Sequence, residues 1–423
     1  MLIFCNKISN KKNSSLRKTP SDFAFEVYDT VASINKETWN AIAHYGSPFL
    51  KTPYLSVLEN EHPENMRFHY ALIYDNKKPV AIAYFQVIDF ASEGFENFID
   101  QESTEVSCAI TSYLKRHLTN HFIRSAGKLN MRLLICGNAF VSGEHGFACS
   151  PEINKVELFD VLADIIYEIG QAEKLNGKIA AILVKDFYSS TKNVSDELKE
   201  FKYHDFLGEP NMIVNINWKT FDEYLNAMSK KYRNRAKNIV KKGTELQRKN
   251  FSASDIKNNA EQIQLLYNNV LHKATFRMAS LSTNYFVEMK NVLQNKFNFI
   301  AYYHNEELIG FRTSFLLEGS VEAHFIGLNY QVNKELELYQ NMLYDYVRET
   351  IDNNLPQLIL GRTASEIKST VGAEAYQLTC YIRHRNPLSN HLIKPFIDSI
   401  KTIDWIPRSP FKEISLEGTT MGA

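Results

Sequence analysis

The sequence predicts an α/β protein of two tandem domains, each with a mixed, mainly antiparallel sheet flanked by helices. Three observations lead to this prediction. The chain has 423 residues, 44% of them hydrophobic, which is enough for two cores. A β-hairpin pattern occurs once in each half, and a helix followed by an apolar strand also occurs once in each half.

The hairpins are the first element of this repeat. "FHYALIYDNKKPVAIAYFQV" at residues 68–87 and "FNFIAYYHNEELIGFRTSFL" at residues 297–316 each place a polar turn between two apolar runs. The turns lie around Asn76 and Asn305, as expected for hairpins. Identities between the two hairpins are few, so the repeat depends on its later elements as well.

A third strand, a helix and a further strand complete each copy. The third strands are expected at residues 132–137 and 321–327. "VELFDVLADIIYEIGQ" at residues 156–171 resembles "LELYQNMLYDYVRETI" at residues 336–351, with apolar residues three and four positions apart. Apolar strands follow at residues 179–187 and 358–364. A meander joined to a β-loop-α-β unit predicts a mixed sheet.

The repeat also sets the expected domain limits. Hairpin and helix lie further apart in the first copy than in the second, which predicts an insertion at residues 89–130. We expect a flexible leader at residues 1–22 and a first domain at residues 23–215. A second domain at residues 216–387 and a tail at residues 388–423 follow.

Composition excludes several function classes. Lys plus Arg and Asp plus Glu both total 48, so no net charge favours DNA or a membrane. The apolar region near the N-terminus is too short for a signal peptide, and no run of about 20 apolar residues occurs. Five scattered cysteines fit a reducing cytoplasm. No zinc pattern, Walker loop, Rossmann fingerprint or serine-hydrolase elbow is present, so we expect no metal site. The cysteines are Cys5, Cys108, Cys136, Cys149 and Cys380.

The element order is similar to that of the GNAT acyltransferase fold. Two tandem copies resemble the Fem-type peptidoglycan aminoacyl transferases and GNAT-like proteins related to them. The resemblance covers roughly residues 25–385 and includes "SPFLKTPYLSVLE", "SKKYRNRAKNIVKKG" and "LGRTASEIKSTVGAEA". It implies an N-acyltransferase whose donor is acyl-CoA or aminoacyl-tRNA. The spaced glycines of the family's acyl-CoA signature are absent between Leu328 and Leu338.

A glycine-rich loop in the first copy is a candidate cofactor-binding element. In "CGNAFVSGEHGFACSPE", Gly137, Gly143 and Gly146 would let backbone N–H groups approach an anion. The alternative is an ordinary surface loop.

The segment "SKKYRNRAKNIVKK" carries seven basic residues and no acidic one. On a helix, Lys230, Arg233, Lys237 and Lys241 share one face. That face is a candidate contact for a phosphate-bearing substrate, tRNA or an anionic membrane surface. The alternative is a solvated helix face.

Three residues in the second copy are candidate catalytic groups. Strand alternation in "SVEAHFIG" predicts Glu322, His324 and Ile326 on one face, with Glu322 or His324 as the base for an ammonium proton. Tyr339 is a candidate acid for a departing thiolate or hydroxyl. The alternatives are an exposed charged pair and a packing aromatic.

The strand "LILGRTA" ends in candidate substrate-binding residues. Gly361 provides room, Arg362 offers forked donors to a carboxylate or phosphate, and Lys368 adds a point charge. The carboxyl ends of strands in open α/β sheets are frequent ligand sites. A turn followed by a helix cap is the alternative.

Together these features predict a cytoplasmic N-acyltransferase, in peripheral contact with the membrane if the basic face binds lipid. It would hold no permanent cofactor and use acyl-CoA or aminoacyl-tRNA as co-substrate. The acceptor would be an amine on a small molecule or a cell-envelope precursor. The competing hypothesis is a catalytically inactive GNAT scaffold that binds a ligand or a membrane-associated partner.

Overall fold

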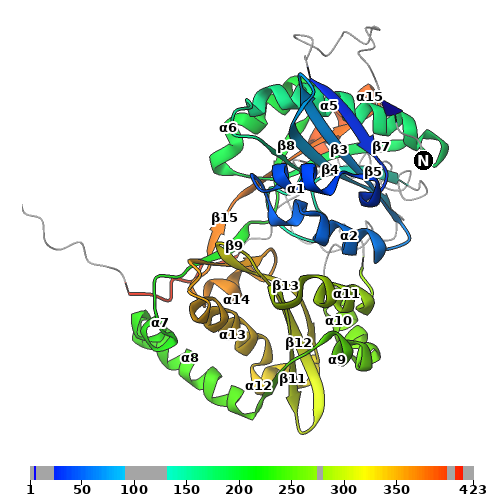
Figure 1. Cartoon of the computed structure of the whole chain (residues 1–423). Helices are drawn as coiled ribbons and strands as arrows, with labels where there is room; N and C mark the ends of the chain where they lie inside the picture. The colour runs from blue at the N-terminus through cyan, green and yellow to red at the C-terminus, as the bar shows by residue number, and fades with distance from the viewer. Residues whose placement is uncertain (1–3, 6–22, 91–130, 274–279, 398–404, 413–423) are drawn as a thin grey trace, which may run out of the picture.

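The computed structural model describes residues 4–5, 23–90, 131–273, 280–397 and 405–412. Two α/β units are stacked on one another, the first above the second in Figure 1. Each unit has one mixed sheet with helices packed against it, as the sequence predicts.

The first sheet has the strand order β1-β2-β3-β4-β5-β7-β16-β8, and β6 pairs with β4. Helix α5 begins after Asn154, whose side chain accepts the N–H of Val156, and it buries Leu158, Leu162 and Ile165 against the sheet. The elements of this half are β1 (Phe4–Cys5), β2 (Ala24–Tyr28), α1 (Lys36–Ala43), α2 (Thr52–Asn60), β3 (Met66–Asp75), β4 (Lys78–Phe90), β5 (Met131–Cys136), β6 (Phe147–Cys149), α5 (Lys155–Ala172), β7 (Ile179–Tyr188), α6 (Lys192–Ser195) and β8 (His204–Leu207).

The second sheet has the strand order β10-β11-β12-β13-β14-β9-β15. Its elements are β9 (Asn211–Asn215), α7 (Phe221–Ala227), α8 (Lys230–Lys242), β10 (Gln247–Asn250), α9 (Ala253–Asn258), α10 (Ala260–Lys273), α11 (Thr283–Leu293), β11 (Phe297–His304), β12 (Glu307–Leu316), β13 (Ser320–Leu328), α12 (Tyr330–Leu336), α13 (Leu338–Asp352), β14 (Gln357–Gly361), α14 (Ser365–Ser369) and β15 (Glu374–Tyr376). The chain continues into β16 (Leu378–His384) and α15 (Pro387–Ile397).

The two units repeat the same strand pairing. The strands β3, β4 and β5 form an antiparallel meander and β5 pairs in parallel with β7, just as β11, β12 and β13 precede the parallel pair β13–β14. Both hairpin turns have positive φ at two consecutive residues, Asn76–Lys77 and Asn305–Glu306, which matches a two-residue turn of type I′. The internal repeat is therefore confirmed.

The last strand of each copy is exchanged between the units. After β8 at the edge of the first sheet, the chain crosses into the second sheet as β9, between β14 and β15. After β15 at the edge of the second sheet, the chain crosses back as β16, between β7 and β8. Each sheet thus contains one central strand from the other half of the sequence.

This exchange means that the expected domain limits do not follow the sheets. Residues 211–215, expected in the first domain, form β9 of the second sheet. Residues 378–384, expected in the second domain, form β16 of the first sheet. Helix α15 packs on β16, so part of the expected tail also belongs to the first unit. A strand shows the same alternation of inward and outward side chains whichever sheet it joins, so the sequence pattern does not reveal the exchange.

Two other expected segments lie largely outside the described residues. These are the insertion, apart from its first two residues in β4, and the leader, apart from β1. Phe4 and Cys5 of the leader pair with Val27 and Glu26 of β2.

Aromatic residues join the two units into one core. Helix α2 of the first unit packs on α11 of the second (Figure 1). The rings of Phe49 and Tyr54 contact Phe315 of β12 edge-on, with centroids 5.1 and 5.9 Å apart. One hydrophobic cluster therefore continues from the first unit into the second.

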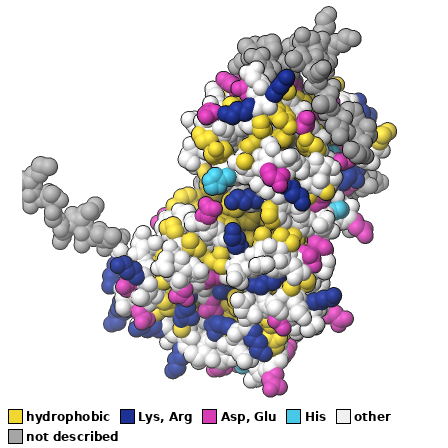
Figure 2. Space-filling view, in the orientation of Figure 1, with side chains coloured by type: hydrophobic (Ala, Val, Ile, Leu, Met, Phe, Trp, Pro, Cys, Tyr) yellow, Lys and Arg dark blue, Asp and Glu magenta, His cyan; other side chains and the backbone are white. Residues whose placement is uncertain are grey.

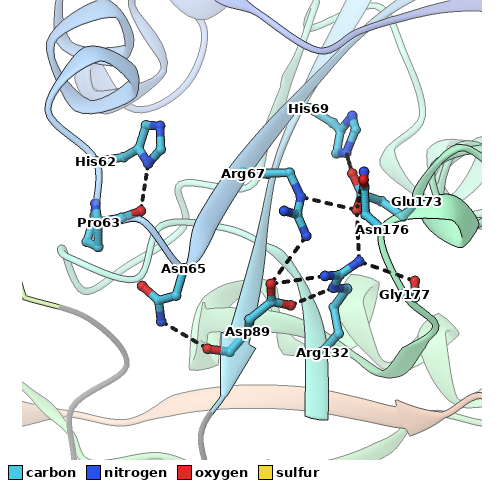
Figure 3. Close-up of polar contacts among 10 residues, drawn as sticks. All are labelled: His62, Pro63, Asn65, Arg67, His69, Asp89, Arg132, Glu173, Asn176 and Gly177. Carbon is cyan, nitrogen blue, oxygen red and sulfur yellow. Dashed lines mark hydrogen bonds and ion pairs between the residues drawn. The ribbon is translucent and has the colours of Figure 1, made fainter. Parts of the chain in front are cut away.

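A charged cluster closes the end of the first sheet beside the insertion (Figure 3). Arg132 of β5 binds both carboxylate oxygens of Asp89 on β4, at 2.5 and 3.0 Å. Arg132 and Arg67 also contact the buried carboxylate of Glu173, and His69 lies 3.1 Å from its other oxygen. Asp89 and Arg132 flank residues 91–130, so these ion pairs hold the two ends of the insertion together.

Candidate functional site

The second sheet forks between the parallel strands β13 and β14. Ser320, Val321 and Glu322 pair with residues 357–359 of β14, whereas β13 continues to Leu328 without further pairing to the described residues of β14. Backbone groups of β13 beyond Glu322 are therefore free of the ladder on this side. The fork opens at the carboxyl ends of the two strands, where open α/β sheets bind ligands.

A β-bulge corrects the predicted faces of β13. The register shifts between Arg312 and Ser314 of β12, so that His324 and Phe325 lie opposite Thr313 alone. The Thr313 side chain bonds the N–H and the carbonyl of Phe325. Because the bulge adds a residue, Phe325 joins His324 on the face toward α10 and α11, and Ile326 turns to the opposite face.

Glu322 lies at the point of the fork and on the face toward the first unit. Its side chain is buried, and it has no hydrogen-bond partner among the described residues. Burial raises the pKa of this carboxyl to about 8. Burial, together with the charge of Glu322, also raises the pKa of Tyr54 and Tyr188 of the first unit, which places both phenols near the carboxyl. A carboxylate of this basicity can take a proton from an ammonium group.

His324 lies two residues further along β13 and is packed among aromatic rings. Its Nε2 lies 2.9 Å from the Tyr285 hydroxyl, and its ring contacts Phe315 and Phe325. Burial lowers the pKa of His324 to about 3, so the ring is neutral at physiological pH. A hydrogen-bonded neutral ring of this pKa is a weak base, which leaves Glu322 as the stronger candidate.

Arg362 follows β14 and connects the two units. Its guanidinium is paired with Asp186 of β7, a fully buried carboxylate that also accepts a hydrogen bond from Lys185 Nζ at 2.8 Å. The Gly143 N–H and the Cys380 thiol donate to the same carboxylate. The structure therefore places one donor of Arg362, its Nη2, on a protein carboxylate, while its Nε has no partner among the described residues.

Lys368 is buried behind the turn that follows β14. Its Nζ donates to the carbonyl oxygens of Gly361 at 3.2 Å and Arg362 at 2.5 Å. Gly361, Thr363 and Ala364 all have positive φ, which is unfavourable for the two residues with side chains. Burial lowers the pKa of Lys368 to about 7. Its observed contacts hold this turn in place.

A cleft of about 810 Å³ lies beside this turn. The turn residues 363–367 form one wall, and Lys231 and Arg235 of α8 form another. Trp405 and Arg408 also line the cleft, but Arg408 is paired with Glu366. Gln340 near the start of α13 lines it as well, so the cleft lies on the α13 side of the sheet.

Helix α8 is basic along its exposed length, and Figure 2 shows Lys and Arg side chains gathered over α7 and α8. Lys231 and Arg235 face the cleft, four residues apart. The predicted residues Lys230 and Lys237 are exposed outside the lining of this cleft, and Arg233 donates to the Asn226 carbonyl. The structure thus brings a different pair from the same basic run to the cleft.

In the glycine-rich loop of the first unit, backbone groups bind other groups of the protein and a lysine side chain fills the adjacent space. The N–H groups of Gly137 and Gly143 donate to the Tyr84 carbonyl and to Asp186. Lys185 fills the space beside the loop, with its Nζ 2.5 Å from the Asn138 carbonyl oxygen, and a Cβ at Gly137 would meet its side chain at 2.6 Å. A Cβ at Gly146 would meet Cys136 at 3.0 Å, so all three glycines are explained by close packing.

Tyr339 lies in the first turn of α13 and packs between two hydrophobic clusters. Burial raises the pKa of its phenol. Its backbone N–H donates to the Asn333 side chain at 2.9 Å, and helix α12 fills the segment between β13 and α13. The start of α13 is therefore capped by the protein itself.

Searches with the sequence and with the structure give different results. No family model and no curated protein matches the sequence. FemX matches the structure with a TM-score of 0.52 and 12% identity, over 85% of this chain and 98% of that chain. A tandem GNAT protein from the clavulanic acid biosynthesis pathway matches with a TM-score of 0.51 and 8% identity, over 86% of this chain and 99% of that chain.

This chain has a tandem GNAT fold. The resemblance inferred from the element order is confirmed at the level of the fold. Each GNAT unit pairs its fourth and fifth strands in parallel, but the two forks differ. In the first GNAT unit β5 pairs with β7 from Arg132 to its last residue, Cys136, whereas in the second GNAT unit the pairing of β13 stops at Glu322. Only the second unit keeps an open fork among the described strands.

The described residues form neither a metal site nor a membrane-spanning helix. No three His, Cys, Asp or Glu side chains among the described residues are grouped so as to hold a metal ion. None of the described helices is long and apolar enough to cross a membrane.

Several residues at the site were not predicted from the sequence. Tyr54 and Tyr188 of the other unit lie near Glu322, and no local pattern marks such a neighbour. Lys231 and Arg235 do have a signal, because their spacing of four within a basic run predicts a shared helix face. Which face meets the cleft depends on how α8 packs.

Proposed function

We propose that the chain is a GNAT-fold N-acyltransferase whose second unit moves an acyl or aminoacyl group from a thioester or ester onto an amine. The observation that carries this proposal is Glu322, a buried carboxyl at the fork with a pKa near 8 and no partner among the described residues. Keeping a carboxyl unpaired in such a place costs stability, which is common at functional sites.

In the proposed reaction Glu322 takes one proton from the acceptor ammonium. The neutral nitrogen attacks the carbonyl carbon of the donor, and free backbone N–H groups at the fork stabilise the oxyanion. A C–N bond forms, the C–S or C–O bond to the carrier breaks, and the new amide loses its extra proton as the carrier is protonated. No covalent enzyme intermediate is required.

The donor would enter through the cleft at the carboxyl end of β14. Acyl-CoA and aminoacyl-tRNA both carry phosphates, and Lys231 and Arg235 line the cleft as exposed cations. The capped start of α13 offers few free N–H groups to a pyrophosphate, which favours a donor whose phosphates contact α8. The acceptor remains an amine on a small molecule or a cell-envelope precursor.

The direct test is a transfer assay with two panels of donors, acyl-CoA thioesters and aminoacyl-tRNAs, and a mixture of primary amines. Formation of a labelled amide, lost in Glu322→Gln, is the expected result. If a donor binds and protects the protein from thermal unfolding but no amide forms with any amine, the inactive-scaffold hypothesis replaces this one.

Reversing the charge of both cleft cations, Lys231→Glu with Arg235→Glu, should weaken donor binding by at least about tenfold at low salt. The reason is that each removed phosphate contact also removes salt-dependent attraction. Binding is measured by fluorescence anisotropy of a labelled donor at several salt concentrations. The same change at Lys230 and Lys237 provides the comparison, and a larger loss from that pair would assign binding to the face predicted from the sequence.

A further inference from the structure

Two buried side-chain atoms at the end of β14 have no hydrogen-bond partner among the described residues. They are Asn211 Oδ1 and Arg362 Nε. The Asn211 side chain is fully buried. Leaving a buried polar atom unpaired is unfavourable, so such an atom usually meets a ligand or a water molecule.

Strand pairing places Asn211 on the same face as Glu322. Glu322 pairs with Ile359, and Ile359 pairs with Ile213, so these three side chains form a row across β13, β14 and β9. Asn211 is two residues from Ile213 and therefore shares its face. This is the face turned toward the first unit, because Met212 and Val214 pack on the opposite side.

Tyr188 is hydrogen-bonded to Asn211 and lies near Glu322. The Asn211 Nδ2 donates to the Tyr188 hydroxyl at 2.9 Å, and Tyr188 also feels the charge of Glu322. Pro210 and Thr363, the chain neighbours of Asn211 and Arg362, both line the cleft. The unpaired oxygen thus lies on the same face of the sheet as the Glu322 carboxyl, and its chain neighbour Pro210 lines the cleft.

We propose that Asn211 positions the acceptor amine, its Oδ1 accepting a hydrogen bond from the ammonium while Glu322 removes a different proton. This inference rests on the proposed function, because Glu322 is the base in both. Two acceptor oxygens, Asn211 Oδ1 and the Glu322 carboxylate, suit an ammonium group. The nearby cations Arg362 and Lys185 are both paired with Asp186, and the Nε of Arg362 keeps its N–H unused among the described residues.

The same surroundings select among amines. Ile213 and Ile359 share a row with Glu322, and Tyr188 is bonded to Asn211, so an aliphatic stem is favoured on this face. A carboxylate next to the amine would lie close to the ionised Glu322 and be repelled by its like charge. The acceptor class is therefore a primary amine on an apolar stem, in preference to an α-amino acid.

The test measures binding of n-hexylamine to the full chain by calorimetry, with 1-hexanol and norleucine as comparison ligands. Wild type should bind hexylamine, and should bind each of the other two at least about tenfold more weakly, since about 1.4 kcal/mol corresponds to a factor of ten. Asn211→Leu, of similar size, should weaken hexylamine binding by about tenfold or more. If this variant does not fold, Asn211→Ala takes its place.

The strand offers a matched control at Asn215. Its Nδ2 also donates to a tyrosine, Tyr376, at 3.1 Å, but its Oδ1 already accepts a bond from Gln357. Asn215→Leu should therefore leave hexylamine binding unchanged. Equal binding by wild type and Asn211→Leu, or no amine binding by wild type, would overturn the inference.

The inference and the proposed function fail in different ways. If Glu322→Gln stops amide formation while Asn211→Leu keeps a wild-type KM for the amine, only the role of Asn211 is wrong. If Glu322→Gln transfers the acyl group at the wild-type rate, the proposed function is wrong whatever Asn211 does.

Discussion

Replacing Glu322 with glutamine is expected to lower the rate of amide formation by about 100- to 10,000-fold, the usual contribution of a general base. Glutamine has nearly the same shape but cannot accept the ammonium proton. Donor binding in the cleft should be unchanged, because Glu322 faces the first unit and the cleft lies on the α13 side. Single-turnover kinetics with saturating donor would measure the chemical step alone.

The pH dependence follows from the raised pKa of Glu322. The base form is present only above its folded pKa of about 8, so the wild-type rate should rise as the pH increases through that value. Glu322→Gln should lose this rise. A rate that stays level from pH 6 to 9 in wild type would contradict the assignment.

Stability should change in the opposite direction to activity. An unfolded glutamate titrates near about 4.3, whereas the folded group titrates near 8, so the folded state holds the proton more tightly. The contribution of protonated Glu322 to the free energy of unfolding is fully present below about pH 4 and is lost as the pH rises toward 8. Glu322→Gln, which cannot ionise, should therefore melt above wild type at pH 8 by at least about 2 °C, and the difference should shrink toward pH 4.

Glu307→Gln is the matched control for these measurements. Glu307 is an exposed residue of β12 in the same sheet. Its rate, pH profile and melting temperature should equal those of wild type. A decrease in melting temperature for Glu322→Gln at pH 8 would indicate a structural role for the carboxylate.

Replacing Asp186 with asparagine is expected to lower the free energy of unfolding by about 3 to 5 kcal/mol, as when one partner of a buried ion pair is removed. Burial opposes ionisation of Asp186, but Lys185 and Arg362 outweigh burial and lower its pKa. Its stabilising effect is therefore present above the unfolded pKa of about 3.9 and is lost as the pH falls below it. Asparagine leaves the buried Lys185 and the partly exposed Arg362 without their anion.

The choice of asparagine separates charge from backbone conformation. Asp186 has a φ of 72°, and asparagine tolerates this left-handed conformation well. Urea denaturation would measure the loss. Adding Arg362→Met to the Asp186→Asn variant should recover part of the stability, because it removes one of the unpaired cations.

Asp205→Asn is the control for Asp186→Asn. Asp205 also pairs with lysines, Lys192 and Lys199, but its side chain is 39% exposed, so its loss should cost less than about 1 kcal/mol. Equal effects at Asp186 and Asp205 would mean that the buried cluster does not hold the units together. Loss of the Asp186 charge would also leave the Arg362 guanidinium without its ion-pair partner.

Local pattern predicted the repeated part of the fold. Alternating apolar residues around Asn76 and Asn305 specify the two hairpins, and apolar residues three and four apart specify α5 and α13. These signals depend on neighbours in sequence, so they survive divergence of the two copies. The open space predicted at Gly361 is also present, since a Cβ there would meet no atom within 4 Å.

The amino-acid sequence by itself therefore determined the two units, their element order and the chemical candidates Glu322 and Arg362. Tertiary structure decided the surroundings of these candidates. The bulge at His324 turns Phe325 to the same face, Asp186 pairs with the guanidinium of Arg362, and Lys185 fills the space beside the first unit's loop. The exchange of β9 and β16 was likewise decided only in three dimensions. The physical reason is that secondary structure follows from contacts between residues a few positions apart. Burial, pKa and the pairing of hydrogen-bonding groups depend on side chains brought together from distant parts of the chain.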